Sequence, residues 1–350
     1  MEISIEFIKI EEEERVMGLS AGIYLCITKD GGQAIYVPYE TFKNKYDGAK
    51  NSGFTPPVSP GVDLSQNLEK HIPTSANRPD FLVLMNFLAK ELKIEGELDD
   101  NSELIIDSSS ATLLELPWEK IVDKTIFVIR RVEAKNPYGN SKESMNNFLY
   151  LLSHSFDGQN SAPIKINLDN EIENIFLLVP NLLKNETVSR FRLSSILLSV
   201  HTTKDMLSKI RWKEYQYIHV IAHGDDSGEI SLESDREHEK VDKMNYSDFL
   251  KLISYSVFEL LFFSFCFSAG GCKNGENLAF SAVNDGIAKY AIGYSYGIGG
   301  DSASKFAQCF YNCLLSMGTD GIESIYKNAL SAYRRAGFGK DYIPLLFSAV

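Results

Sequence analysis

Two stretches of this chain decide its fold, IHVIAHG at Ile218–Gly224 and ELLFFSFC at Glu259–Cys266. Each runs apolar for several residues, as strands do when they are buried on both faces of a sheet. Each also ends in a reactive side chain, His223 or Cys266. The segment between them has room for a loop and a crossover helix, so we expect the two strands to run parallel. His223 and Cys266 would then lie together at the carboxyl edge of the sheet.

The chain around this pair alternates strands and helices, which predicts an α/β fold. We expect a mostly parallel sheet covered by helices on both faces. Residues 136–170, in contrast, are polar and loop-like, with a short apolar insert at Phe148–Leu152. The predicted strands are Ile175–Pro180, Tyr217–Ala222, the strand that ends at Cys266, and Lys289–Gly293; the predicted helices are Val188–Val200, Tyr246–Ser254, Asn277–Asn284, Ala303–Met317 and Gly321–Ala336.

The N-terminal region has a different pattern. Period-two alternation predicts strands at Ile3–Ile8, Gly22–Ile27 and Gln33–Val37, with a hairpin turn at Lys29–Gly32. Proline and glycine between Gly48 and Pro60 predict a linker. We therefore expect a small β-rich region at residues 1–60 and one larger domain at residues 61–350.

Composition restricts the class of partner and the location. The 350 residues include 35 Lys and Arg against 47 Asp and Glu, a net charge of −12. Phosphate binding needs excess positive charge, so this balance argues against nucleic acid or an anionic membrane as a direct partner. The sequence shows no secretory signal and no apolar run long enough to span a bilayer. Its five cysteines form no regular framework, so we expect a cytoplasmic protein.

Together, the two strand ends predict a cysteine nucleophile with its general base. Cys266 would attack a carbonyl carbon, and His223 would accept the thiol proton or pair with the thiolate. The backbone N–H groups of Gly224 and Cys266 are the candidate oxyanion hole, in which one donor is commonly worth about 3 kcal/mol of transition-state stabilisation.

The sequence resembles the CHAT family, the caspase- and separase-like cysteine peptidases. The resemblance rests on His223-Gly224, on the small residues after Cys266, on Tyr294-Ser295-Tyr296 with Asp301, and on Leu116-Pro117-Trp118-Glu119. It extends to the closing helices and a final strand at Pro344–Phe347, and so covers roughly Phe81–Val350. It implies a caspase-like fold, cleavage of specific proteins by a His223/Cys266 dyad, and no cofactor. Phe267, where the family often carries a polar residue, and the loose Gly297–Gly300 turn depart from the pattern.

Acidic residues near the pair suggest a substrate preference. Asp301, with Asp225 and Asp226, would place negative charge near the first pocket, and Tyr296 would line it. This predicts cleavage after Arg or Lys. The alternative for Asp301 is a cap on a helix that begins near Ser302.

Several alternatives remain open at this stage. Cys272 is a rival nucleophile, but it follows two glycines in a loop. His219 suggests a metal site only weakly, because no zinc-ligand spacing accompanies it; we expect no metal.

Two classes of function remain, an active endopeptidase or an inactive caspase-like interaction module. The peptidase would need a protein substrate and a regulatory protein or effector-sensing subunit. Family analogy suggests antiviral defence or cell death as its context.

Overall fold

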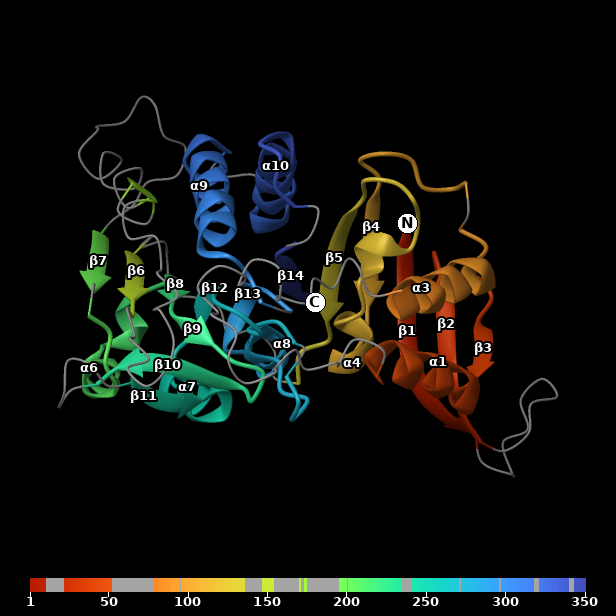
Figure 1. Ribbon diagram of the computed structural model, residues 1–350, viewed down its shortest axis with the longest axis horizontal. Coiled ribbons are helices and arrows are strands. Elements are labelled where there is room, and N and C mark those ends of the chain that lie inside the picture. Colours follow the sequence, from red (N-terminus) through yellow and green to blue (C-terminus); the bar gives the residue numbers. More distant parts are fainter. Residues whose placement is uncertain are drawn as a thin grey trace, which may run out of the picture. The chain divides into compact units, whose positions relative to one another are not determined.

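The computed structural model describes residues 1–10, 22–51, 79–94, 96–135, 147–153, 170, 173–174, 195–199, 201–234, 241–270, 272–295, 297–317, 321–339 and 343–350 (Figure 1). These residues divide into two compact units. The first holds the described residues of 1–133 together with Val350, and the second holds those of 134–349.

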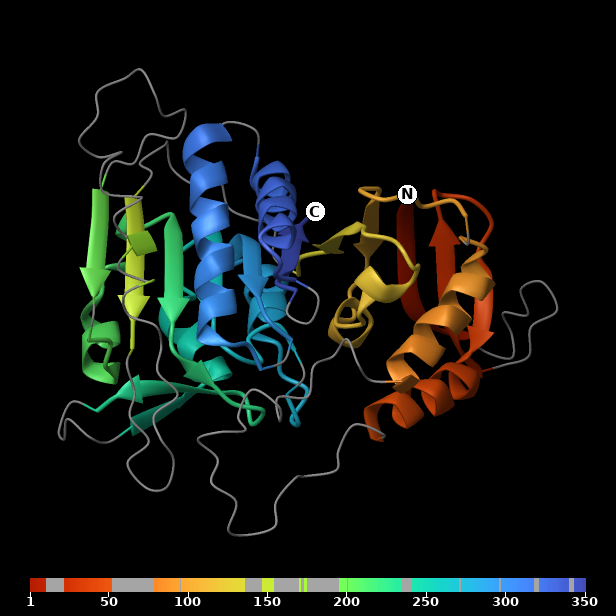
Figure 2. The ribbon, with the colours of Figure 1, turned by 45° about the horizontal axis from the view of Figure 1, so that its top comes forward.

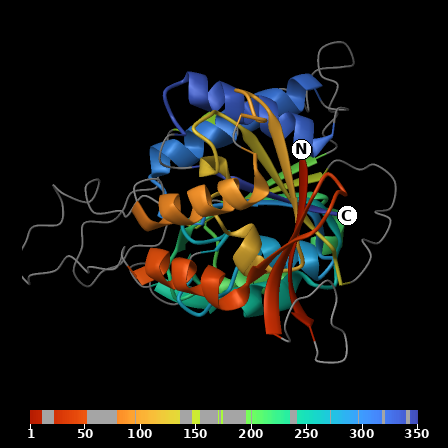
Figure 3. The same cartoon turned by 90° about the vertical axis from the view of Figure 1, so that its right-hand side faces the viewer.

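The first unit is built on a mixed sheet. Its strand order is β3 (Ile35–Pro38), β2 (Gly22–Lys29), β1 (Glu2–Ile10), β4 (Glu103–Asp107) and β5 (Phe127–Val132). Strands β1 to β3 pair antiparallel, whereas β4 runs parallel to both β1 and β5. Helices α1 (Tyr39–Asn51) and α3 (Pro79–Leu92) lie side by side on one face (Figure 3). Two short helices, α4 (Ala111–Leu114) and η3 (Trp118–Lys120), precede β5.

This unit is larger than the predicted N-terminal region. Strand β4 pairs with β1, Glu2 opposite Ile105, so the chain as far as Glu133 belongs with the N-terminal strands. The division therefore differs from the predicted boundary at residue 60, because a parallel strand pair joins segments that are remote in sequence. The predicted linker also overlaps the end of α1, which continues to Asn51.

The second unit contains a six-stranded, mostly parallel sheet. Its order is β14 (Leu345–Ala349), β13 (Ala288–Gly293), β12 (Phe258–Ser264), β8 (Tyr217–Ile221), β6 (Asn147–Leu152) and β7 (Ser195–Ser199). Only β14 runs antiparallel to its neighbour in this sheet. The prediction of an α/β fold with a mostly parallel sheet is confirmed.

Two successive residues of β12 show that helices cover both faces of this sheet. Phe262 packs edge-on against Phe306 and Phe310 of α9 (Gly300–Met317). Its neighbour Phe263 points the other way and meets Phe249 of α7 (Tyr246–Ile253). Helix α10 (Ile322–Arg335) lies beside α9 (Figure 2). Helices α6 (Lys204–Lys209), η4 (Trp212–Glu214) and α8 (Leu278–Asn284) also belong to this unit.

Two segments of this sheet were predicted wrongly. Phe148–Leu152 lies in the buried strand β6, although it was assigned to a polar loop. Residues 195–199 form the strand β7, which pairs with β6, although a helix was expected there. Short apolar runs fit either a buried strand or a buried helix segment, and only strand pairing decides between them. The predicted strand at Ile175–Pro180 lies outside the described residues.

A small antiparallel sheet follows β8. It consists of β9 (His223–Gly224), β10 (Glu229–Glu233) and β11 (Val241–Asn245). Strands β10 and β11 thus lie on the two sides of residues 235–240, which are outside the described residues. In the described residues, no helix is both long and apolar enough to cross a membrane.

Candidate active site

His223 lies at the carboxyl end of the parallel sheet, as the sequence predicted. Strand β8 ends at Ile221, and after Ala222 the chain enters β9. There His223 pairs with Ser231 and Gly224 pairs with Ile230 of β10. The small sheet therefore fixes the backbone that carries the imidazole, which is half-buried.

Cys266 follows the neighbouring strand, two residues beyond the end of β12. Cys266 is half-buried, and the N–H of Ile298 donates a hydrogen bond to Sγ at 3.2 Å. Burial raises the pKa of the Cys266 thiol, and the N–H groups of Ile298 and of Cys266 itself offset part of that increase. Burial therefore favours the thiol over the thiolate at this position.

Gly224 brings the ends of the two strands together. A Cβ built on Gly224 would lie 2.2 Å from the carbonyl oxygen of Cys266 and 2.7 Å from Cδ2 of Phe265. Only a residue without a side chain allows this approach. The residue next to His223 is thus packed directly against the backbone of Cys266.

The turn after Cys266 is tightly held. Phe267 has a φ of 61°, in the left-handed region that bulky residues rarely adopt. The buried hydroxyl of Ser268 donates to the Phe265 carbonyl at 2.8 Å and accepts from the Tyr294 N–H at 3.0 Å. These bonds join the turn to the end of β13. Strain of this kind is common where a structure fixes a functional side chain.

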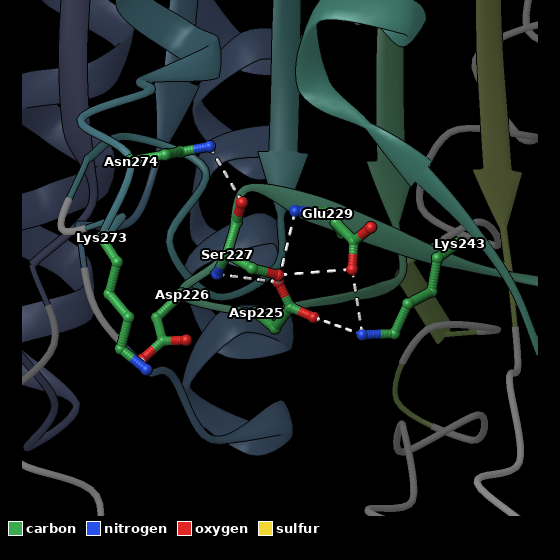
Figure 4. A network of polar contacts seen from close by, with 7 residues as sticks. All are labelled: Asp225, Asp226, Ser227, Glu229, Lys243, Lys273 and Asn274. Carbon is green, nitrogen blue, oxygen red and sulfur yellow. Dashed lines mark hydrogen bonds and ion pairs between the residues drawn. The ribbon is translucent and has the colours of Figure 1, made fainter.

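Asp225 and Asp301, the acidic residues expected in a substrate pocket, differ from each other in their surroundings. Burial alone would raise the pKa of Asp225, but hydrogen bonds from Lys243 and Ser227 hold it below its usual value (Figure 4). Lys243 pairs with both Asp225 and Glu229, so this group of three side chains keeps one net negative charge. Asp301 is exposed within the first turn of α9 and accepts a hydrogen bond from Asn170 at 3.3 Å.

The helix start also changes the interpretation of Asp301. Helix α9 begins at Gly300 rather than near Ser302, so Asp301 lies inside the helix and is not its cap. Tyr296, which was also predicted to line the pocket, lies outside the described residues.

The rival residues occupy the core. Cys272 is 2% exposed, and its Sγ lies 3.5 Å from the Phe267 carbonyl. His219 is fully buried, with Nδ1 bonded to the Tyr311 hydroxyl and Nε2 2.6 Å from Ser264 Oγ. Burial lowers the pKa of His219 to about 3, so it is neutral. Across the described ranges, no three His, Cys, Asp or Glu side chains are placed to hold a metal ion.

No family model and no curated protein matches this chain. Solved structures do.

The RgpB pro- and mature-domain complex of Porphyromonas gingivalis matches at 12% identity and a TM-score of 0.42, over 88% of this chain and 75% of that one. Separase in the separase–securin complex of Saccharomyces cerevisiae matches at 10% identity and a TM-score of 0.45, over 99% of this chain and 30% of that one. The Drosophila initiator caspase Dronc matches at 13% identity and a TM-score of 0.33, over 61% of this chain and 87% of that one. The chain thus spans under a third of the separase chain.

Sequence reasoning missed Ile298, the residue that contacts the candidate nucleophile. The Gly297–Gly300 stretch was noticed only as a loose turn that departs from the family pattern. Glycines on both sides of a single apolar residue were the available signal, because they let the backbone approach a neighbouring side chain closely. The role of Glu119 in the Leu116–Glu119 motif was also missed: its carboxylate forms a buried ion pair with Arg130.

Proposed function

We propose that this chain is a cysteine endopeptidase with a caspase-like fold, of the CHAT type. Cys266 is the nucleophile and His223 is the general base. The observation that carries this proposal is the packing of Gly224 against the Cys266 backbone, which joins the carboxyl ends of β8 and β12. A scaffold protein would need neither reactive side chain at these positions.

In the proposed reaction, His223 takes the proton of the Cys266 thiol as Sγ attacks the scissile carbonyl carbon. The carbonyl oxygen becomes an oxyanion, which the N–H groups of Gly224 and Cys266 stabilise. The imidazolium then gives its proton to the leaving amine, and a thioester forms. Water, deprotonated by His223, hydrolyses the thioester and restores the thiol.

Regulation by a partner is part of the proposal. The half-buried position of Cys266, its hydrogen bond from the Ile298 N–H and the pKa that burial raises support a resting state of reduced reactivity. A regulatory protein or an effector-sensing subunit would move the Gly297–Gly299 segment and expose Sγ. A defence or cell-death context and a cytoplasmic location follow from the family resemblance alone.

For specificity, we propose a preference for Arg or Lys before the scissile bond, with Asp301 in the pocket wall. This preference is supported by the position of Asp301, two residues after the Gly297–Gly299 segment, in which Ile298 contacts Cys266. A panel of fluorogenic peptides should show faster cleavage after Arg or Lys, and Asp301→Asn should reduce that advantage. Equal cleavage of all peptides by the unaltered protein contradicts this preference.

The dyad is tested by intact-protein mass spectrometry after exposure to an Arg-chloromethylketone. We expect a single adduct that Cys266→Ala abolishes and His223→Ala slows by roughly a hundredfold, typical of a lost general base. An adduct that persists in Cys266→Ala would transfer the nucleophile to another cysteine, and Cys272→Ala tests the nearest one. If a small thiol reagent modifies Cys266 equally in His223→Ala, the chain is an interaction module.

A further inference from the structure

Two loops meet beside the candidate dyad. The first is the turn Asp225–Gly228, which follows His223-Gly224, and the second is the loop Lys273–Glu276, which follows the Cys266 turn. The Lys273 N–H donates to the Asp226 carbonyl at 2.7 Å, and the Lys273 ammonium pairs with the Asp226 carboxylate at 2.8 Å (Figure 4). One residue of each loop is thus joined through both backbone and side chain.

Asn274 adds a second connection, and both ends of its amide are used. Its Nδ2 donates to the Ser227 carbonyl at 2.9 Å, across the two loops. Its Oδ1 accepts the Glu276 N–H at 3.0 Å, within its own loop. The first contact shapes the junction and the second fixes the rotamer, so the amide bridges the loops in one orientation (Figure 4).

The fit between the loops is close. Gly228 has a φ of +81°, and a Cβ on it would lie 2.8 Å from Asn274 Nδ2 and 2.7 Å from Glu276 Oε2. The turn is also rigid on its other side, since Asp225 N–H donates to the Glu229 carbonyl of β10 at 3.2 Å. A displacement of the turn therefore has to move β9, which carries His223.

We propose that Asn274 is a positioning residue that holds the turn Asp225–Gly228, and with it the adjoining strand β9, against the loop Lys273–Glu276. The Asp226–Lys273 pair supports this contact. This inference rests on the proposed function, because it assigns the residue that sets the dyad's geometry. Lys273 and Asp226 have side-chain exposures of 62% and 32%, and exposed ion pairs contribute little. The exposed amide of Asn274, in contrast, is held at both ends, by the Ser227 carbonyl across the loops and by the Glu276 N–H within its own loop.

Asn274→Asp is the sharpest variant. The side chain at position 274 keeps its shape and its acceptor for the Glu276 N–H. A carboxylate oxygen replaces the Nδ2 donor, however, and faces the Ser227 carbonyl. A matched control exists on α10, where Asn328 Nδ2 donates to the Ser324 carbonyl at 2.9 Å. Asn328→Asp removes an equivalent donor away from the two loops and should behave as the unaltered chain.

The measurement uses the full chain. Iodoacetamide alkylation of Cys266, followed by peptide mass spectrometry across pH, reports the thiolate without requiring a peptide substrate. In Asn274→Asp we expect a fall of roughly tenfold in the rate at neutral pH, since small misplacements of reacting groups are costly. Its pH profile should shift towards that of His223→Ala. With a cleavable fluorogenic peptide, kcat should fall and KM should stay.

Each outcome decides between the two proposals. Unchanged alkylation and turnover in Asn274→Asp, with His223→Ala impaired, overturns the positioning role and leaves the dyad intact. If His223→Ala alkylates like the unaltered chain, the dyad fails and the positioning role fails with it. Circular dichroism verifies folding. Should Asn274→Asp unfold, Asn274→Ala replaces it: this variant loses the hydrogen bond to the Ser227 carbonyl and should also slow alkylation, and an unchanged rate in it overturns the proposal.

Discussion

At the scale of single residues, Gly224 leaves no room for a side chain beside Cys266. The neighbouring atom is a backbone oxygen, which cannot rotate away as a side chain would. We expect Gly224→Ala to destabilise the chain by about 1–3 kcal/mol through overpacking and to separate β9 from Cys266. Thermal unfolding and Cys266 alkylation measure the two effects. Unaltered stability together with unaltered alkylation would show that the close approach is unimportant.

At the scale of elements, the buried ion pair of the first unit fixes the short helix η3 to β5. Arg130 donates to both oxygens of Glu119 at 2.8 and 2.9 Å and to the Leu114 carbonyl at 2.7 Å. Glu119→Gln leaves a buried guanidinium without its counter-charge, so we expect a loss of about 3–5 kcal/mol in the free energy of unfolding. Urea denaturation measures it. Glu97→Gln, which breaks the exposed pair with Lys29, should cost at most about 1 kcal/mol; equal losses would contradict this reasoning.

At the scale of the whole molecule, we expect His219 and Asp107 to make the stability of the two units respond to acid with opposite signs. In the second unit, the pKa of His219 falls from about 6.5 to about 3 on folding, so stability is complete above pH 6.5 and is lost as pH falls towards 3, at up to about 1.4 kcal/mol per pH unit. In the first unit, burial and Glu2 raise the pKa of Asp107 to about 6, so its contribution is lost as pH rises through 6. Calorimetry at pH 7 and pH 5 should show the second unit weakened and the first strengthened. His219→Gln should abolish the second unit's response, and an unchanged response in that variant would refute the assignment.

The sequence by itself determined the elements with clear periodicity and the two strand ends. Period-two alternation placed β1 to β3, and continuous apolar runs that end in His223 and Cys266 placed β8 and β12, because local side-chain pattern sets which backbone conformation buries apolar surface. Only the tertiary structure decided the rest. Strands β6 and β7 depend on pairing between segments remote in sequence, as does the grouping of β4 with β1. The contacts of Ile298 with Cys266 and of Asn274 with Ser227 have no local signal either, because each joins two loops that meet only once the sheet has assembled.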